Sequence, residues 1–238
     1  MPKTRSPGRR PGGDQLTPEQ IVAAALLVID RDGLDGFSMR AVAQELGVYP
    51  TAIYWHFKTG KNGLLAAVAS KAMDGVAPAL HLGDDWRDWI RHLFRRYRQA
   101  LAGHPNVAPL LGAQIVSNAG ANPILVERVL TALHGAGFRD DALVDTYNAV
   151  VAAMLGYVTL EFAPAPRDDP DGWAREFQGR LRALPPDHYP LIHANFGRLA
   201  NRAFILRWES GSTAPLDGGF ETYLDAFVRG LEARLAQP

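Results

Sequence analysis

Apolar residues recur at intervals of three and four along almost the whole chain of 238 residues, and this helical spacing constrains the fold more than any other feature. The alternation of β-branched and polar residues between hairpin turns, which would indicate strands, does not stand out in any segment. Nearly half of the residues (47%) are hydrophobic, so a chain of this length can bury a sizeable core. The sequence therefore predicts an all-α protein.

The first helix is expected to begin at Thr17, because Thr17 to Gln20 combines a capping residue, a proline in the first turn and a capping-box glutamine. Gly33 should end it. A second helix should run from a Ser38 cap to Leu46, and a third, short helix should follow with Pro50 in its first turn. A fourth is predicted to begin near residue 64 and to continue towards residue 79.

The composition changes after residue 83, where Asp84 or Asp85 is expected to cap a helix over about 86–102. The longest apolar run, Ala149 to Leu160, is shorter than the roughly 20 residues of a membrane span and indicates a buried helix instead. The further helices are predicted at about 105–116, 122–135, 140–162, 171–183, 190–200 and 219–236.

The second and third helices are spaced as a helix-turn-helix motif. Counting Met39 as the first position, the small residue Ala43, the turn residue Gly47 and the apolar Ile53 fall at positions five, nine and fifteen, as the motif requires. Gly47 suits the corner because a positive φ angle there is cheap only for glycine. Ile53 and Phe57, four residues apart, would hold the short helix against the other two.

If Ile53 and Phe57 face inward, the other side of the short helix is exposed and carries groups that can contact base edges in the major groove of DNA. Lysines follow where the chain would leave the groove, and they suit phosphate contacts. The alternative is that the aromatic string 54–57 is a core cluster. The predicted DNA-binding residues are Met39, Arg40, Pro50, Thr51, Ala52, Tyr54, His56, Lys58 and Lys61.

Residues 16 to 73 resemble the DNA-binding head of the TetR family of bacterial regulators, and within it the tetracycline-repressor branch. The resemblance lies in Gly36-Phe37-Ser38-Met39-Arg40-x-Val42-Ala43-x-x-Leu46-Gly47-Val48 and in Ala52-Ile53-Tyr54-Trp55-His56-Phe57. It implies a homodimeric regulator, most simply a repressor that binds a palindromic operator and is released by a small-molecule effector, which the sequence does not identify. It also implies that Trp55 packs partly against the start of helix four.

On this basis the expected parts are a basic disordered arm (1–13), a helix-turn-helix DNA-binding domain (14–65), a connecting helix (66–82) and an effector-binding and dimerisation domain (83–238). One departure from the family stands between Phe57 and Leu64, where the chain has six residues, one more than is usual. Thr59 is expected to cap helix four there, and Gly60 and Gly63 should make the junction soft.

The effector pocket is predicted among the helices at about 86–102, 105–116, 122–135 and 140–162. Its expected lining is Trp89, Tyr97, His104, Asn118, Tyr147, Met154 and Tyr157, although aromatic residues at helical spacing more often form a core. The dimer interface is expected on the helices at 140–162 and 219–236, packed as a four-helix bundle. Its expected residues are Val144, Val151, Leu155, Phe220, Tyr223, Leu224 and Phe227.

A helical-bundle enzyme is the alternative of a different class. The segment 58–63 lacks the spacing of a phosphate-binding loop, and Gly-x-Ser-x-Gly and His-Glu-x-x-His are absent. We therefore expect no enzyme, no cofactor and no metal site. A further alternative is a sequence-specific or architectural DNA-binding protein without a small-molecule effector. The chain has no cysteine, and its start has no apolar core of a secretory signal, so we expect a cytoplasmic protein without membrane association.

Overall fold

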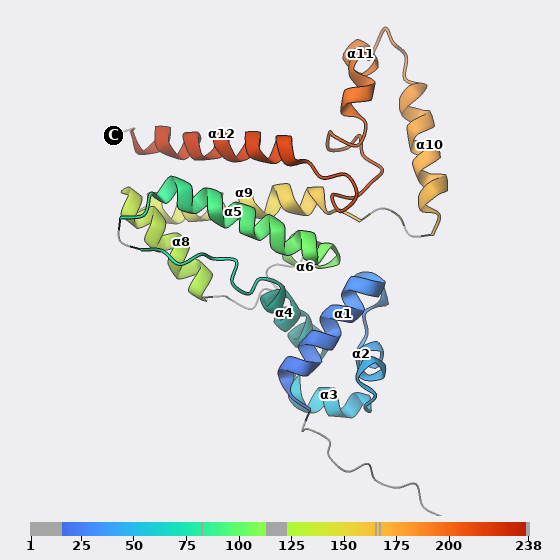
Figure 1. Cartoon of the computed structure of the whole chain (residues 1–238), viewed down its shortest axis with the longest axis vertical. Coiled ribbons are helices and arrows are strands. Elements are labelled where there is room, and N and C mark those ends of the chain that lie inside the picture. Colours follow the sequence, from blue (N-terminus) through green and yellow to red (C-terminus); the bar gives the residue numbers. More distant parts are fainter. Residues whose placement is uncertain (1–15, 82, 113–122, 165, 167, 237–238) are drawn as a thin grey trace, which may run out of the picture.

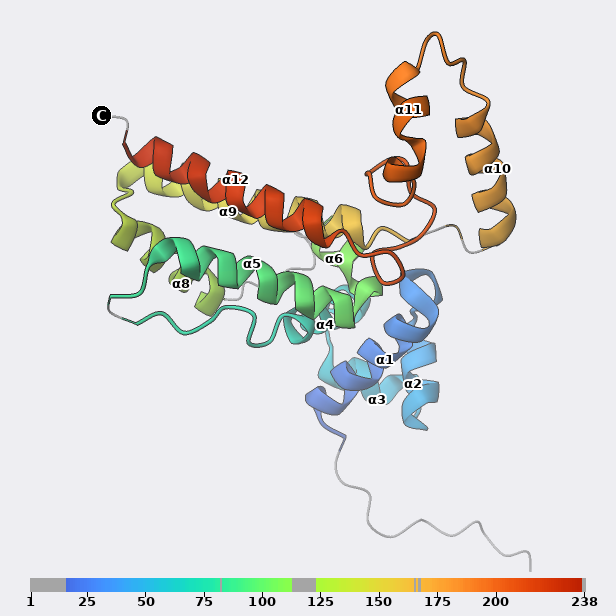
Figure 2. The same ribbon diagram turned by 45° about the horizontal axis from the view of Figure 1, so that its top comes forward.

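The computed structural model describes residues 16–81, 83–112, 123–164, 166 and 168–236, and these residues contain helices and no strand. A small head at one end joins a bundle of longer helices, and a helical hairpin stands out from the far side of the bundle (Figures 1 and 2). The head and its connecting helix comprise α1 (Pro18–Gly36), α2 (Met39–Leu46), α3 (Pro50–His56) and α4 (Gly60–Ala72). The all-α prediction is confirmed.

The head begins with the predicted capping box, in which Thr17 and Gln20 bond each other's backbone N–H groups. The apolar face of α1 is buried as its spacing predicted. Gly33 has φ 66° and ψ −177° and interrupts the helix there, although one further turn continues to Gly36. The Ser38 side chain caps α2 by accepting from Ala41 N–H at 3.1 Å.

The connecting helix α4 is shorter and lies earlier than predicted, since it begins at Gly60 and ends at Ala72. Thr59 occupies the position before it, but its side chain makes no capping hydrogen bond, so the expected cap is not formed. Gly60 adopts φ 68°, and a Cβ on Gly63 would lie 1.8 Å from Thr59 Oγ1. Gly60 is therefore favoured by its left-handed backbone, and a side chain at position 63 would require the Thr59 side chain to move.

The bundle comprises α5 (Trp86–Gly103), η1 (Pro105–Val107), α6 (Ala108–Gly112), α8 (Pro123–Ala136), α9 (Asp140–Glu161) and α12 (Asp217–Leu235). Of the two expected caps, Asp85 caps α5 by accepting from Arg87 N–H at 2.8 Å. Arginines of α5 pair with acids of α12, and these pairs fix the register of the two helices: Arg87 with Glu232, Arg91 with Asp225, Arg95 with Glu221 and Arg98 with Asp217.

Helix α9 runs beside α12 and is only partly buried within one chain (Figure 2). Val150, Met154 and Val158 face the core, whereas Val144 and Leu160 are more than half exposed. Among the described residues, α9 is the helix long and apolar enough to cross a membrane by length and composition, and 22% of its most apolar window is buried. The prediction of a buried helix is thus only partly confirmed.

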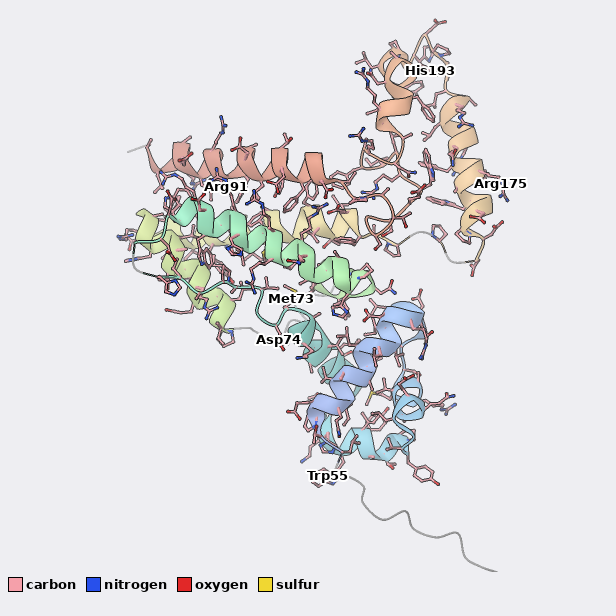
Figure 3. The ribbon with its side chains drawn as sticks, in the orientation of Figure 1. Trp55, Met73, Asp74, Arg91, Arg175 and His193 are labelled. Carbon is pink, nitrogen blue, oxygen red and sulfur yellow. The ribbon has the colours of Figure 1, made fainter. Side chains whose placement is uncertain are left out.

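The hairpin consists of α10 (Pro170–Arg182) and α11 (Pro190–Leu199), and neither helix contains a buried residue. Trp173 and Phe177 stack on each other within α10, with ring centroids 5.5 Å apart. Arg182 lies over the ring of Phe196 and so links the two helices. Figure 3 shows Arg175 and His193 on this hairpin, well away from the head.

Candidate nucleic-acid interface and effector-binding interior

The turn between α2 and α3 is built as the motif predicted. Gly47 ends α2 in the left-handed region, with φ 65° and ψ 31°, and Val48 N–H returns to Ala43 O at 3.0 Å. Ala43 and Ile53 are buried, with exposures of 1% and 0%, so the short α3 is anchored against α1 and α2. Its opposite side is left for contact with another molecule.

The predicted DNA-binding residues divide by exposure. The exposed ones are Arg40, Thr51, Tyr54, Lys58 and Lys61. The half-buried ones are Pro50, Ala52 and His56. Met39 is 7% exposed and belongs to the core of the head, so its predicted contact with DNA is corrected. The Met39 side chain faces inward because it lies on the same face of α2 as Val42 and Ala43.

Lys61 is exposed but already engaged within the head. Its ammonium group donates to Phe37 O at 3.4 Å and lies 5.5 Å from the centre of the Phe37 ring. Of the two predicted phosphate-binding lysines, Lys58 is therefore the freer one, and Lys61 ties the start of α4 to the start of α2.

Two aromatic side chains on this surface were missed or misplaced by sequence reasoning. Trp55 is 74% exposed at the tip of the head and makes an edge contact with His56, so the expectation that it packs against the next helix is wrong (Figure 3). Tyr49, just before α3, is 83% exposed. Trp55 is two residues from buried Ile53 and therefore lies on the opposite side of α3, and Tyr49 lies before the helix begins.

The interior of the bundle holds three of the predicted ligand-binding residues, since Trp89, Tyr97 and Met154 are buried at 5%, 1% and 3% exposure. Within the described residues, Trp89 Nε1, Tyr97 Oη and Thr146 Oγ1 are buried without a hydrogen-bond partner. Burial raises the pKa of Tyr97 above its ordinary value, so this hydroxyl stays protonated and able to donate. The core between α5 and α9 therefore contains buried polar atoms that make no hydrogen bond with the described residues.

The other predicted ligand-binding residues lie elsewhere. Tyr147 is half-buried, and its pKa is raised by burial. Tyr157 lies between α9 and α12, where its ring stacks on Tyr223 at 5.1 Å and its hydroxyl donates to Leu216 O at 3.2 Å. Asn118 is outside the described residues, as are the basic residues of the predicted arm.

His104 is placed at the junction between bundle and head, and not in the interior. Its Nδ1 lies 2.8 Å from Asp30 Oδ2 at the end of α1. Asn106 Nδ2, two residues further on, donates to Ile29 O at 3.1 Å and to Asp30 O at 2.9 Å. The C-terminal end of α5 is thus fastened to the first helix of the head, a connection that the sequence did not suggest.

The expected dimer interface is corrected in part. Phe220 and Leu224 have exposures of 1% and 0% within a single chain, so they belong to the core and are not available to a partner. Phe227 and Tyr223 are half-buried, with Phe227 packed on Phe94 at 5.5 Å. The exposed apolar surface of α9, which includes Val144, is left uncovered.

Comparison with known proteins agrees with this geometry. Residues 21–68 match the family described as bacterial regulatory proteins, tetR family, and residues 77–235 match the tetracyclin repressor-like C-terminal domain. An HTH-type transcriptional regulator of Saccharopolyspora erythraea is 32% identical over 76% of this chain and 75% of its own length. The tetracycline repressor protein class A from transposon 1721 of Escherichia coli is 35% identical over 86% of this chain and 90% of its length. The structure of the TetR family protein ActR of Streptomyces coelicolor in complex with actinorhodin has a TM-score of 0.62 at 25% identity, covering 93% of this chain and 98% of ActR.

Proposed function

The chain belongs to the tetR family of bacterial regulatory proteins, and from this premise we propose that it is a homodimeric, cytoplasmic repressor whose palindromic operator is released when a small molecule binds the bundle. Membership of this family makes it a transcriptional regulator and not an enzyme. The observation that carries the proposal is the outward face of α3, held in place by buried Ile53 and bounded by left-handed Gly47.

The residues that would read the operator are those exposed on and around α3. Thr51 and Tyr54 offer hydroxyl groups and a ring edge to bases in the major groove, and half-buried Pro50, Ala52 and His56 would fit against thymine methyl groups or base edges. Arg40 and Lys58 are exposed and would make phosphate contacts, which fix the register of the protein on DNA. Tyr49 and Trp55 extend the same surface.

The dimer would form through α9 and α12, whose uncovered faces carry small residues. Ala152 and Gly156 on α9 and Ala226 and Gly230 on α12 are exposed, and a Cβ on either glycine would meet no atom within 4 Å. Small residues allow close approach of helices, and a twofold pairing of these two helices gives a four-helix bundle. A dimer also supplies the two reading heads that a palindromic operator requires.

The effector would bind between α5 and α9, where Trp89, Tyr97 and Thr146 have polar atoms that lack partners within the described residues. The relative ActR has been solved with actinorhodin, which favours a small organic effector here as well. A ligand changes operator affinity only if it binds the two dimer shapes differently. Asn106, in the short η1 that follows α5, would connect this interior to α1 of the head.

The function is tested by selecting a random double-stranded DNA pool on the purified protein at a fixed salt concentration. The wild type should enrich an inverted repeat, and Thr51→Ala and Tyr54→Ala should each lose it. Arg198→Gln, which removes an exposed charge from the hairpin, serves as the control and should recover the same repeat. Enrichment without a repeat by the wild type would contradict the proposal.

The dimer face is tested separately with Gly230→Arg. The arginine has room within one chain, so the variant should fold but sediment as a monomer and lose operator binding. A Gly230→Arg protein that stays dimeric would place the interface elsewhere.

A further inference from the structure

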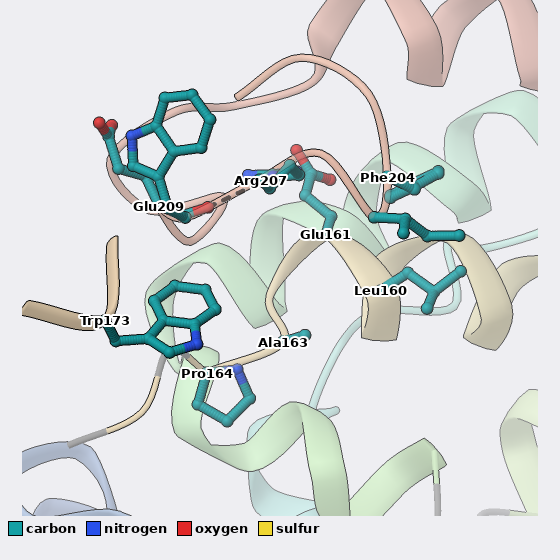
Figure 4. Close-up of a pocket in the computed structure, with 10 residues that line it drawn as sticks. Leu160, Glu161, Ala163, Pro164, Trp173, Phe204, Arg207 and Glu209 are labelled. Atoms are coloured by element: carbon teal, nitrogen blue, oxygen red, sulfur yellow. Dashed lines mark hydrogen bonds between the residues drawn. The ribbon is translucent and has the colours of Figure 1, made fainter. Parts of the chain in front are cut away.

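A cavity of about 310 Å³ lies where the end of α9 meets the foot of the hairpin, outside the interior discussed above (Figure 4). We call it the hairpin cavity. Its walls are mainly apolar and aromatic, from Leu160 and Pro164 on one side and Trp173, Phe204 and Trp208 on the others. Its volume is at the lower end of the range for small-molecule sites, enough for a bicyclic aromatic compound.

The aromatic walls are held by partners outside the cavity. Trp173 is stacked on Phe177, and Phe204 packs edge-on against Tyr157 at 5.0 Å. The Trp208 backbone N–H donates to Asn201 Oδ1 at 2.9 Å. Trp173 and Phe204 therefore each pack on a neighbouring ring in the absence of a ligand.

Arg207 is the polar group of this cavity whose hydrogen bonding is incomplete. Its Nη2 donates to Ala214 O at 2.8 Å and its Nε to Glu209 O at 3.3 Å, whereas Nη1 is inaccessible to solvent and, within the described residues, has no partner. No carboxylate of the described chain lies within 4.0 Å of the Arg207 guanidinium. A buried donor left without an acceptor is costly, and a carboxylate is the acceptor that guanidinium groups bind best.

The nearest buried carboxylate, Glu161, is already committed. Its two oxygens accept from Arg98 at 2.8 and 2.7 Å and from the Leu216 backbone N–H at 2.8 Å, with no exposed surface left. Burial lowers the pKa of Arg207 in spite of the negative charge of Glu161 and Glu209 nearby. Among the described residues, no carboxylate forms an ion pair with Arg207. A bound anion of suitable shape would supply that partner.

We propose that the hairpin cavity is a binding site for a planar aromatic carboxylate, whose ring lies between Trp173, Phe204 and Trp208 and whose carboxylate pairs with the guanidinium group of Arg207, which lines the cavity. The loop that presents Arg207 is closed by an internal hydrogen bond. Asn201 closes it with a hydrogen bond to the Glu209 carboxylate at 2.8 Å, and Ile205 in the same loop holds a φ of 68°. A β-branched residue in this left-handed region is strained, and such strain concentrates at binding sites.

The proposal is tested by titrating the full chain, without DNA, with naphthoate and with its neutral analogue naphthamide in a calorimeter. Naphthoate should bind at a single saturable site, about tenfold or more tighter than naphthamide, because a charge-assisted hydrogen bond contributes about 1.5–3 kcal/mol. Arg207→Gln should remove this preference. Arg198→Gln, a matched loss of charge on α11, should keep it.

Trp173→Ala provides a second variant that leaves the Arg207 loop unchanged, and it should weaken both ligands by a similar factor of about ten. Absence of saturable naphthoate binding, or unchanged preference in Arg207→Gln, would overturn the proposal. Because the titration contains no DNA, its failure is independent of the failure of the operator selection described above.

Discussion

In the head, α2 and α3 are only eight and seven residues long, yet they bury Met39, Val42, Ala43 and Ile53. In the hairpin, α10 and α11 are 13 and 10 residues long and bury no residue. Both regions show helical spacing, proline in the first turn and exposed polar faces. The difference lies in what covers their apolar residues, since the head closes on α1 whereas the hairpin stands clear of the bundle (Figure 1).

This difference separates helix formation from helix burial. The hairpin is held by a few aromatic and cation–π contacts, such as Trp173 on Phe177 and Arg182 on Phe196, and by His193 Nε2 at Leu184 O. Regions with so few buried apolar contacts open locally at lower free energy than a packed core. We therefore expect the head to be rigid and to position side chains, and the hairpin to adjust around what it contacts.

The largest effect that distinguishes the two regions should come from shortening a buried residue in the head. Ile53→Ala should lower the free energy of unfolding by about 2–5 kcal/mol and abolish operator binding, because it removes the anchor of α3. Leu191→Ala in the hairpin, where the side chain is 76% exposed, should change it by less than about 0.5 kcal/mol. Urea denaturation of both variants measures the change in the free energy of unfolding. Equal changes in the two variants would contradict the expected difference between head and hairpin.

Alkaline pH should loosen the hairpin before the head. Burial raises the pKa of Tyr157 to about 12, and it also raises the pKa of Tyr97. The neutral phenol is thus favoured by folding, so this stabilisation is complete below the ordinary value near 10 and is lost as pH rises through about 12.

Phe204 contacts the bundle through the ring of Tyr157. Hydrogen exchange at rising pH measures the loss of protection that follows when Tyr157 ionises. Protection of α10 and α11 should fall before that of α1 to α3, and Tyr157→Phe should delay the loss. Simultaneous loss in both regions would show that the hairpin is not a separate unit.

A substitution at the junction between head and bundle should have an intermediate effect on the free energy of unfolding. Asn106→Ala leaves Ile29 O and Asp30 O, just before the interruption at Gly33, without their side-chain donor, which should cost about 1–2 kcal/mol. If α5 transmits to the head through this contact, operator affinity should also change in the absence of effector. A variant with unaltered stability and affinity would show that the Asn106 contact does not couple the bundle to the head.

The elements that were predictable from sequence are those fixed by contacts close in the chain. The Thr17 capping box, the Ser38 cap and left-handed Gly47 each depend on neighbours close in the chain, and the burial of Ile53 follows from the spacing of the helix-turn-helix motif. His104, Phe220 and Arg207 could not be placed this way, because their partners Asp30, Arg98 and Ala214 come from other elements or from an irregular loop. Spacing predicts which face of a helix is apolar, but it does not predict which element covers that face.

The smallest effect on the free energy of unfolding should come from the strained loop at the foot of the hairpin. Here the substitution should stabilise the fold, whereas the others destabilise it. Ile205 is 90% exposed and holds φ 68°, so it contributes strain and little burial. Ile205→Asn should raise the free energy of unfolding by about 1 kcal/mol, since asparagine tolerates the left-handed region that costs other residues about 1–2 kcal/mol. Thermal unfolding should register a higher midpoint. A lower midpoint would mean that Ile205 is covered in the dimer, and the hairpin would then belong to the interface and not stand clear of it.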